Sequence, residues 1–158
     1  SNAVSLSEAV MLFGSSLALV QYSSLSNNDN DKTSKQFSWK MSKINGLFTA
    51  FALLVLCLLP QNVYTFIFGK GFSEISTAIR ILSIGILPLS IASNFTQYFY
   101  AKGNFKISTV ASLIGLAITI IAGLILIPKY QLQGAAFTAT LSYFTTFAIE
   151  FYFFALKK

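Results

Sequence analysis

The sequence predicts an all-α protein, a polytopic transmembrane helical bundle of about five spans. Three observations lead to this prediction. Of the 158 residues, 54% are hydrophobic and only 10% are charged, whereas soluble domains carry about 25% charged residues. The hydrophobic residues are gathered into long blocks, and the charged residues lie mainly between these blocks. Such a chain has too little polar surface to cover a water-soluble globule.

Each of five blocks is long enough to cross a bilayer, which takes about 20 apolar residues. For the first block, a buried helix of a soluble core is an alternative, because it contains Glu8, Gly14 and several serines. Backbone polar groups in lipid must be satisfied within the chain, and the alternation typical of barrel strands is missing, so the blocks are predicted to be helices. The predicted spans are Val4 to Tyr22, Ile44 to Phe68, Ile75 to Ala101, Phe105 to Ile127 and Leu132 to Leu156.

The basic residues predict how these helices are oriented. The polar stretch Ser23 to Lys43 is expected to be a loop. If five spans alternate in direction, the opposite side receives Lys70 and Lys129, with Arg80 near that surface or inside the third span. The lysine-rich side is predicted to be cytoplasmic, which places the N-terminal end outside and the C-terminus inside. The lysines on the cytoplasmic side would be Lys32, Lys35, Lys40, Lys43, Lys102, Lys106, Lys157 and Lys158.

An odd number of spans that enters from outside favours the C-terminal portion of a longer protein. The remaining N-terminal spans would then complete the bundle and would be partners of this chain. Ser1, Asn2 and Ala3 are compatible with a cloning scar and also with native sequence.

The sequence does not contain the residue patterns of an enzyme or a metal site. It has no histidine, a lone Cys57, no Gly-rich phosphate loop and no nucleophile elbow. The few acidic residues do not pair on one helical face within a span. We therefore expect no enzymatic activity, no metal and no cofactor. The net charge of +6 does not predict nucleic-acid binding, because the lysines are not gathered on one face or along one helix.

Polar residues inside the predicted spans are the candidates for lining a substrate path, because a charge at mid-bilayer costs about 2.5 to 3.5 kcal/mol. Arg80 either snorkels outward or points into a cavity. Asn94 and Gln97 share a face, where hydrogen bonding to a neighbouring helix is the alternative to lining a hydrophilic path. Glu8 has three interpretations: an interfacial residue, a partner of another helix, or a protonatable group. Glu150 is expected to be interfacial and compensated by the two C-terminal lysines.

Helix shape and packing are predicted from proline and small residues. Pro88 removes a backbone donor and crowds the carbonyl of Ile84, so a kink is expected there, with Gly85 one turn earlier. Small residues let helices approach closely in lipid. They form stripes at Ser108, Ser112, Gly115 and Gly123 of the fourth span and at Gly134, Ala135, Ala136 and Ala139 of the fifth.

Several short turns carry a resemblance to a known family. They are Phe68-Gly69-Lys70-Gly71-Phe72, Ala101-Lys102-Gly103-Asn104-Phe105-Lys106, and Leu126-Ile127-Pro128-Lys129-Tyr130-Gln131-Leu132-Gln133-Gly134-Ala135-Ala136 followed by Thr138, Ala139, Thr140, Ser142 and Tyr143, with Ser7-Glu8-Ala9 in the first span. Together they resemble the polysaccharide biosynthesis or oligosaccharide flippase family, in the MATE-like MOP flippase superfamily. In the third turn, Pro128 is expected to end the fourth helix, and Gly134 with two alanines to let the fifth fold back tightly.

The resemblance implies a two-lobed bundle that works by alternating access, of which this chain would be the last five spans. The implied function is to flip a polyprenyl-diphosphate-linked oligosaccharide across the bacterial cytoplasmic membrane for polysaccharide or O-antigen export, including lipopolysaccharide assembly. Membrane lipid and the lipid-linked oligosaccharide would be its partners. A cationic cavity would suit the diphosphate, yet Arg80 is the only arginine, so either the other spans supply charge or the substrate differs.

Two alternatives to this function stay open. One is a multidrug or small-molecule exporter of the same superfamily, which the same spans would serve. The other is a non-transport scaffold subunit of polysaccharide assembly.

Overall fold

The computed structural model describes residues 20–28, 30–58 and 75–156, and every regular element in them is helical. The helices are a short one at 20–26, α2 (Asp31–Leu58), α4 (Ile75–Ala101) and α5 (Phe105–Leu156). The all-α prediction is therefore confirmed for the described residues. Glu8, most of the first predicted span and the end of the second lie outside them.

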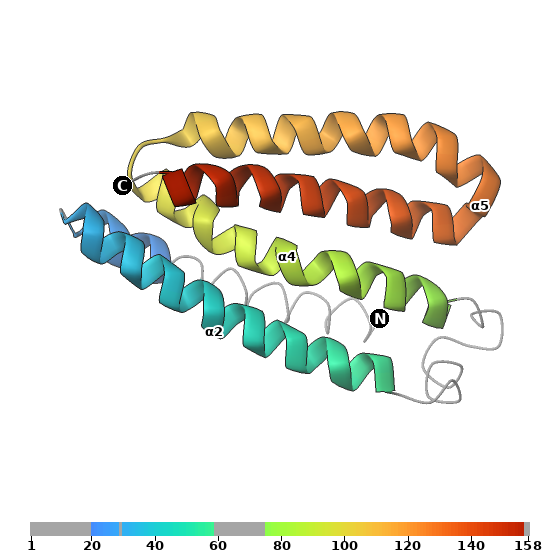
Figure 1. Cartoon of the computed structure of the whole chain (residues 1–158), viewed down its shortest axis with the longest axis horizontal. Helices are drawn as coiled ribbons and strands as arrows, with labels where there is room; N and C mark the ends of the chain where they lie inside the picture. The colour runs from blue at the N-terminus through green and yellow to red at the C-terminus, as the bar shows by residue number, and fades with distance from the viewer. Residues whose placement is uncertain (1–19, 29, 59–74, 157–158) are drawn as a thin grey trace, which may run out of the picture.

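Helix α5 consists of two antiparallel arms. Gln131 has non-helical backbone angles (φ 47°, ψ −119°), and the chain reverses there, so that residues 105–130 and 132–156 lie side by side (Figure 1). The arms correspond to the predicted fourth and fifth spans. Pro128 lies inside the helical stretch, so the helix turns at Gln131 and not at Pro128 as expected. A Cβ added at Gly134 would overlap the carbonyl of Leu126, which confirms the tight fold-back.

The stretch 23–43 was expected to be a loop, and this expectation is wrong. Residues 20–26 are helical and α2 begins at Asp31, so the connection is short. Asn30 Oδ1 accepts hydrogen bonds from the backbone N–H groups of Lys32 and Thr33 at 3.1 and 3.3 Å, which caps the helix. The composition is misleading because the polar residues include a row at four-residue spacing that is buried against the bundle: Ser34, Ser38 and Ser42.

The turn between α4 and α5 explains why α4 ends at Ala101. Gly103 has a φ of +70°, a left-handed conformation that favours glycine. The Asn104 N–H donates to the Phe99 carbonyl at 2.8 Å, and the Gly103 N–H donates to the Tyr100 carbonyl at 3.0 Å. These two bonds form the Schellman arrangement that satisfies carbonyls at a helix end.

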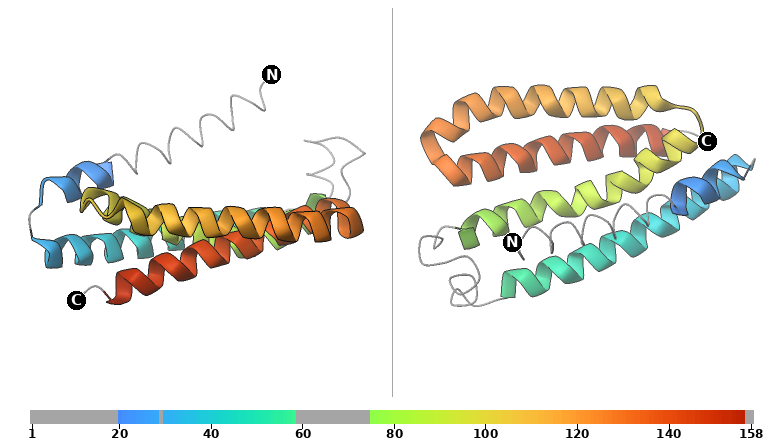
Figure 2. Two further views of the ribbon diagram at one scale, coloured as in Figure 1. Left: turned by 90° about the horizontal axis from the view of Figure 1, so that it is seen from above. Right: turned by 180° about the vertical axis from the view of Figure 1, so that it is seen from behind.

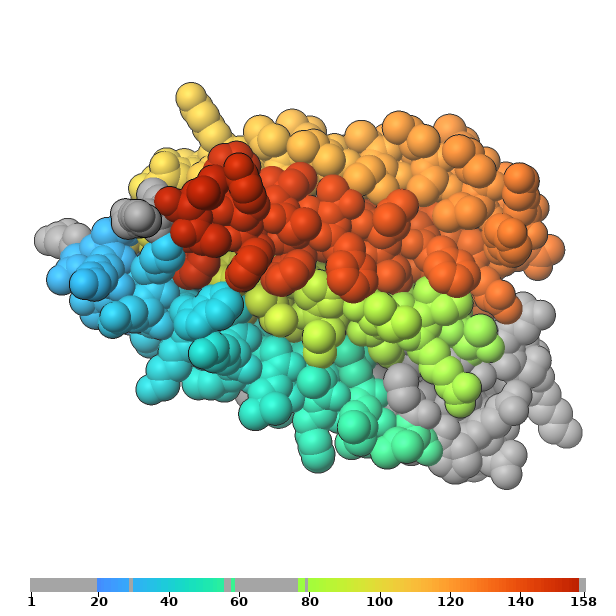
Figure 3. Space-filling view, in the orientation of Figure 1, coloured from blue at the N-terminus to red at the C-terminus, as the bar shows by residue number. Residues whose placement is uncertain are grey.

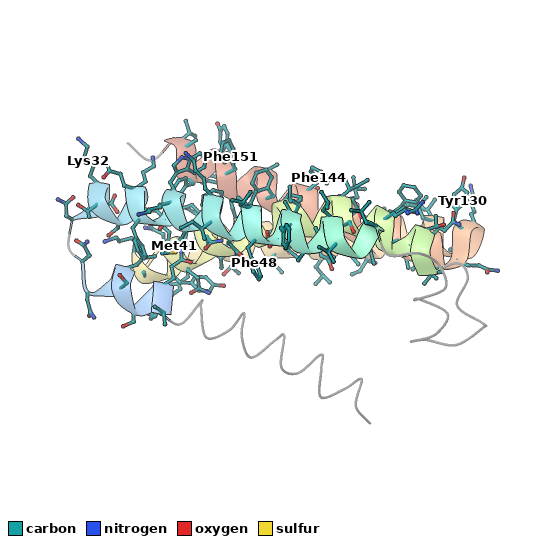
Figure 4. The ribbon with its side chains drawn as sticks, turned by 90° about the horizontal axis from the view of Figure 1, so that it is seen from below. Lys32, Met41, Phe48, Tyr130, Phe144 and Phe151 are labelled. Carbon is teal, nitrogen blue, oxygen red and sulfur yellow. The ribbon has the colours of Figure 1, made fainter. Side chains whose placement is uncertain are left out.

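Helix α4 lies between α2 and α5 and contacts both. The two further views show that all these helices follow the long axis of the molecule (Figure 2). The beginning of α2, the end of α4 and both the beginning and the end of α5 gather at one end of the bundle (Figure 1). Lys32 and Tyr130 lie at opposite ends (Figure 4). Lys32, Lys35, Lys102 and Lys106 therefore share an end, opposite Lys129.

The outer surface of the bundle is apolar, unlike that of a soluble protein. Large apolar side chains are exposed, such as Leu47 at 75%, Leu124 at 74% and Phe48 at 64%. Exposed apolar surface on this scale indicates contact with lipid or with other helices. The side chains buried between the helices include Ser34, Ser38, Ser42, Asn94, Ser108, Thr138, Ser142 and Glu150.

The membrane spans themselves are only partly accounted for by the described helices. Among these helices, α5 alone is long and apolar enough to cross a membrane, and its reversal divides it into two arms. The total of five spans therefore stays a prediction.

Gly85 brings α4 close to the second arm of α5. A Cβ added to it would lie 2.7 Å from Thr140 Cα, so a side chain there would push the two backbones apart. Helix α4 continues from Ile75 to Ala101 with Pro88 inside it, and both Gly85 and Pro88 are buried. The helix is thus continuous through both residues, Gly85 permits close packing, and the kink at Pro88 stays a prediction.

We predict that Gly85→Ala destabilises the protein and that Gly123→Ala does not. At Gly85 the new methyl group meets backbone, whereas at Gly123 its nearest neighbour would be Ile127 Cδ1 at 3.5 Å, an ordinary contact. Overpacking costs about 1 to 3 kcal/mol, while alanine gains up to about 1 kcal/mol over glycine in a helix. Thermal unfolding of the detergent-purified protein measures the difference. Equal melting temperatures for the two variants would contradict the close contact.

Candidate functional site

An aromatic cluster joins three helices at the end of the bundle where α2 begins. Trp39 of α2 stacks on Phe95 of α4, with ring centroids 6.1 Å apart. Phe95 stacks in turn on Phe154 of α5 at 4.4 Å, and Phe151 lies 6.1 Å from both Trp39 and Phe95. Phe95 and Phe154 are buried, whereas Trp39 and Phe151 are about 40% exposed. The cluster therefore has a packed base and an accessible outer face.

A groove of about 410 Å³ lies over this outer face, a volume within the range of small-molecule sites. In the space-filling view, the second arm of α5 and the first part of α2 meet at this end of the molecule (Figure 3). The side-chain view places Phe151 toward the same end as Lys32 (Figure 4). The residues that line the groove are Lys35, Gln36, Trp39, Phe151, Phe154 and Ala155.

Lysines of α2 border this apolar surface. Lys35 Nζ lies 5.2 Å from the centroid of the Phe154 ring, and Lys43 Nζ lies 5.4 Å from that of Trp39. These are cation–π distances. Lys32 and Lys40 are exposed on the same helix. An aromatic surface with a cationic edge suits a molecule with an apolar chain and an anionic head.

Two polar contacts hold the beginning of α2 against the end of α4. The buried Tyr98 donates its hydroxyl hydrogen to Asp31 Oδ1 at 2.9 Å. Lys102 Nζ donates to the carbonyl of Asn28 at 2.7 Å. Because hydrogen bonds to charged groups are stronger than neutral ones, these contacts fix the helix that carries Lys35 and Trp39.

The residues predicted to line a substrate path are not gathered at this groove. Asn94 is buried. Its side-chain Nδ2 donates to the backbone carbonyl of Ser90 at 2.9 Å, and its backbone carbonyl accepts from Gln21 Nε2 at 3.1 Å. The Asn94 side chain thus bonds within α4, and the backbone carbonyl joins α4 to the helix at 20–26, so a path-lining role for Asn94 stays a prediction. Gln97 is half-buried and Arg80 is exposed, about 21 Å along α4 from Asn94 at 1.5 Å per residue. Glu8 lies outside the described residues.

Glu150 was expected to be interfacial, and this expectation is wrong. Its side chain is only 1% exposed, and Thr96 Oγ1 lies 2.8 and 2.9 Å from its two carboxyl oxygens. Proximity in sequence to the C-terminal lysines was the misleading signal. A better signal was available, because Glu150 continues a row at four-residue spacing that faces the other helices: Thr138, Ser142 and Thr146.

The groove residues were missed for a different reason. Lys35 and Trp39 belong to the stretch that was interpreted as a loop, and no periodicity links them to Phe151 and Phe154 more than a hundred positions later in the chain. Only the packing of α2 beside the second arm of α5 brings them together.

The chain is similar to known membrane proteins. The model of the family described as "Lipid II flippase MurJ" matches residues 3–158. The chain is 33% identical over 110 residues to the capsular polysaccharide biosynthesis protein CapF of Staphylococcus aureus, which covers 69% of this chain and 28% of that protein. It is 29% identical over 100 residues to the uncharacterized membrane protein MJ1068 of Methanocaldococcus jannaschii, covering 63% and 20%. The matched region is less than a third of either relative, and no solved structure matches significantly.

Proposed function

Because this chain belongs to the MurJ family of lipid II flippases, we propose that it is part of a transporter that moves a lipid-linked oligosaccharide across the bacterial cytoplasmic membrane by alternating access. The match to the family model over residues 3–158 carries this proposal. Similarity to a capsular polysaccharide biosynthesis protein supports a glycan precursor as the cargo. O-antigen and lipopolysaccharide precursors are candidates within this class. The rest of the transporter would be supplied by further spans of the same protein.

The groove over the aromatic cluster is the proposed contact for this cargo. An isoprenoid chain would lie along Trp39, Phe151 and Phe154, which offer an apolar surface. The diphosphate would be met by Lys35 and Lys43 at the edge, because ammonium groups pair with phosphate oxygens. The chemistry required is binding and release, with no covalent step.

The proposed topology has five spans with the lysine-rich end of the bundle in the cytoplasm. Lys32, Lys35, Lys102 and Lys106 share that end, as the positive-inside rule requires. The groove would then open where a precursor made in the cytoplasm enters the membrane. We predict that single cysteines at positions 32 and 129, introduced in a Cys57→Ser background, react with an impermeant thiol reagent from opposite faces of sealed vesicles. Labelling of both from one face would contradict this topology.

We predict that the double variant Lys35→Gln, Lys43→Gln slows translocation of a fluorescent polyprenyl-diphosphate-linked glycan in proteoliposomes. Hydrogen bonds to charged groups contribute about 1.5 to 3 kcal/mol, so apparent affinity should fall at least about tenfold. The matched control is Lys40→Gln, which removes an exposed lysine of α2 that does not line the groove. All variants are made in the full-length protein and are compared at equal amounts in the vesicles.

The same assay separates the alternatives. Translocation of small cationic drugs without translocation of the glycan would favour the exporter. A stable complex with glycosyltransferases and no translocation at all would favour the scaffold. If Lys40→Gln lowers the rate as much as the double variant does, the groove is not the binding site.

Arg80 provides a separate test of the substrate path. We predict that Arg80→Ala lowers surface polysaccharide in cells without lowering the amount of the protein in the membrane, because an exposed guanidinium is available to a phosphate of the cargo. Arg80→Lys keeps the charge and should retain part of the activity. Unchanged polysaccharide at equal abundance removes Arg80 from the path.

A further inference from the structure

Three helical segments meet at the carboxyl group of Glu150. The residue lies on the second arm of α5 and is 1% exposed. Thr96 of α4 brings its hydroxyl oxygen to 2.8 and 2.9 Å from the two carboxyl oxygens. Ser108 of the first arm of α5 is buried beside the same carboxyl group. The acid is therefore enclosed by protein on the sides that α4 and the first arm provide.

The number of hydroxyl hydrogens around Glu150 determines which hydrogen bonds the protonated and the ionised carboxyl group can make. Thr96 has one hydroxyl hydrogen and a further acceptor in the Ala92 carbonyl at 3.2 Å. An ionised Glu150 only accepts, so Thr96 would have to give up the bond to Ala92. A protonated Glu150 donates to Thr96 Oγ1 and leaves Thr96 free to donate to Ala92. In the neutral form Thr96 thus keeps its bond to Ala92 while it accepts from the acid, and the Ser108 hydroxyl stays unpaired.

The Ser108 hydroxyl can supply the additional hydrogen-bond donor that an ionised Glu150 would need. Its hydroxyl oxygen is buried and has no hydrogen-bond partner among the described residues. A buried unpaired hydroxyl is unusual, because such groups lose their bonds to water. When the carboxyl group loses its proton, the Ser108 hydroxyl is placed to turn and donate to the new anion. The cluster therefore holds hydrogen bonds for both forms of Glu150.

The charged groups at this end of the bundle make other contacts. Asp31 of α2 accepts from Tyr98, and Lys35 of α2 lies over the Phe154 ring. Lys102 at the end of α4 donates to the Asn28 carbonyl, and Lys106 of α5 is exposed. The hydrogen bonds of the Glu150 carboxyl with the described residues are made by the Thr96 hydroxyl. Hydroxyl groups compensate a buried charge less well than a cation does.

We propose that Glu150, Thr96 and Ser108 form a reversible proton-binding site between α4 and the two arms of α5. In the packed arrangement the carboxyl group carries the proton. On release, its O–H bond breaks, water takes the proton, and Thr96 and Ser108 donate to the anion. The site is independent of the cargo of the transporter and of the lysine-bordered groove.

Infrared spectroscopy of the protein in lipid vesicles tests this site. A protonated Glu150 carboxyl group should give a carbonyl stretch that is lost as the pH rises. Glu150→Gln should abolish this band while keeping the fold, because an amide can donate to Thr96 in the same place. Asp31→Asn is the matched control and should leave the band in place, since Asp31 is exposed on α2. Ser108→Ala should shift the loss of the band to higher pH, because the anion would lack one of its donors.

Two outcomes would overturn the site. A band that persists unchanged in Glu150→Gln would belong to another acid. The absence of any Glu150-dependent band across the pH range in which the protein stays folded would mean that the residue is a permanent anion. Neither outcome bears on glycan translocation, so failure of the proton site and failure of the flippase proposal can be told apart.

Discussion

Close approach between helices is the constraint on which the rest of this structure depends. In lipid, burying apolar side chains against another helix gains little, so helices associate through tight contacts and polar bonds. Gly85 removes the side chain that would hold α4 away from Thr140, and the Thr140 hydroxyl then reaches the Ile81 carbonyl at 3.0 Å. Ser142 reaches the carbonyl of Gly115 at 2.9 Å in the same way. Each glycine thus permits one hydrogen bond across a helix interface.

The candidate site follows from these contacts. With α4 held against both neighbours, its aromatic residue Phe95 becomes the shared base for Trp39 and Phe154. The aromatic side chains that remain partly exposed then face outward beside Lys35. Beside Phe95 on α4, Thr96 contacts the buried Glu150 of the same arm of α5. One central helix thus organises an accessible surface and a buried acid at the same end of the bundle.

The sequence alone predicted the helices where apolar blocks are bounded by clear turn signals. The bounds of α4 were predicted correctly, because Gly103 marks its end and the apolar block marks its length. The two arms of α5 were predicted as separate spans, and the reversal at Gln131 lies in the predicted connection between them, although Pro128 does not end the first arm.

The predicted positions were wrong for polar residues that are buried between the helices. The beginning of α2 was missed because buried serines have the composition of a loop, and Glu150 was misplaced because nearby lysines suggested a surface. The groove could not be predicted, since it unites residues that are close only after α2 has packed beside the second arm of α5. Of the residues predicted to line a path, Asn94 makes helix contacts in the structure, and path-lining roles for it and for Arg80, Gln97 and Glu8 stay predictions.

The short reversal at Gln131 also constrains how this part of the protein is made. Hydrocarbon offers no partner to backbone groups that a turn leaves unbonded, so in the proposed topology the turn has to cross the bilayer to reach water on the far side. Gly134 and the Leu126 carbonyl pack so closely that the two arms can pair before they arrive. During synthesis at the ribosome, the arms are then expected to leave the translocation channel together as a hairpin that carries Lys129, the one charged residue between Lys106 and Glu150, across the membrane.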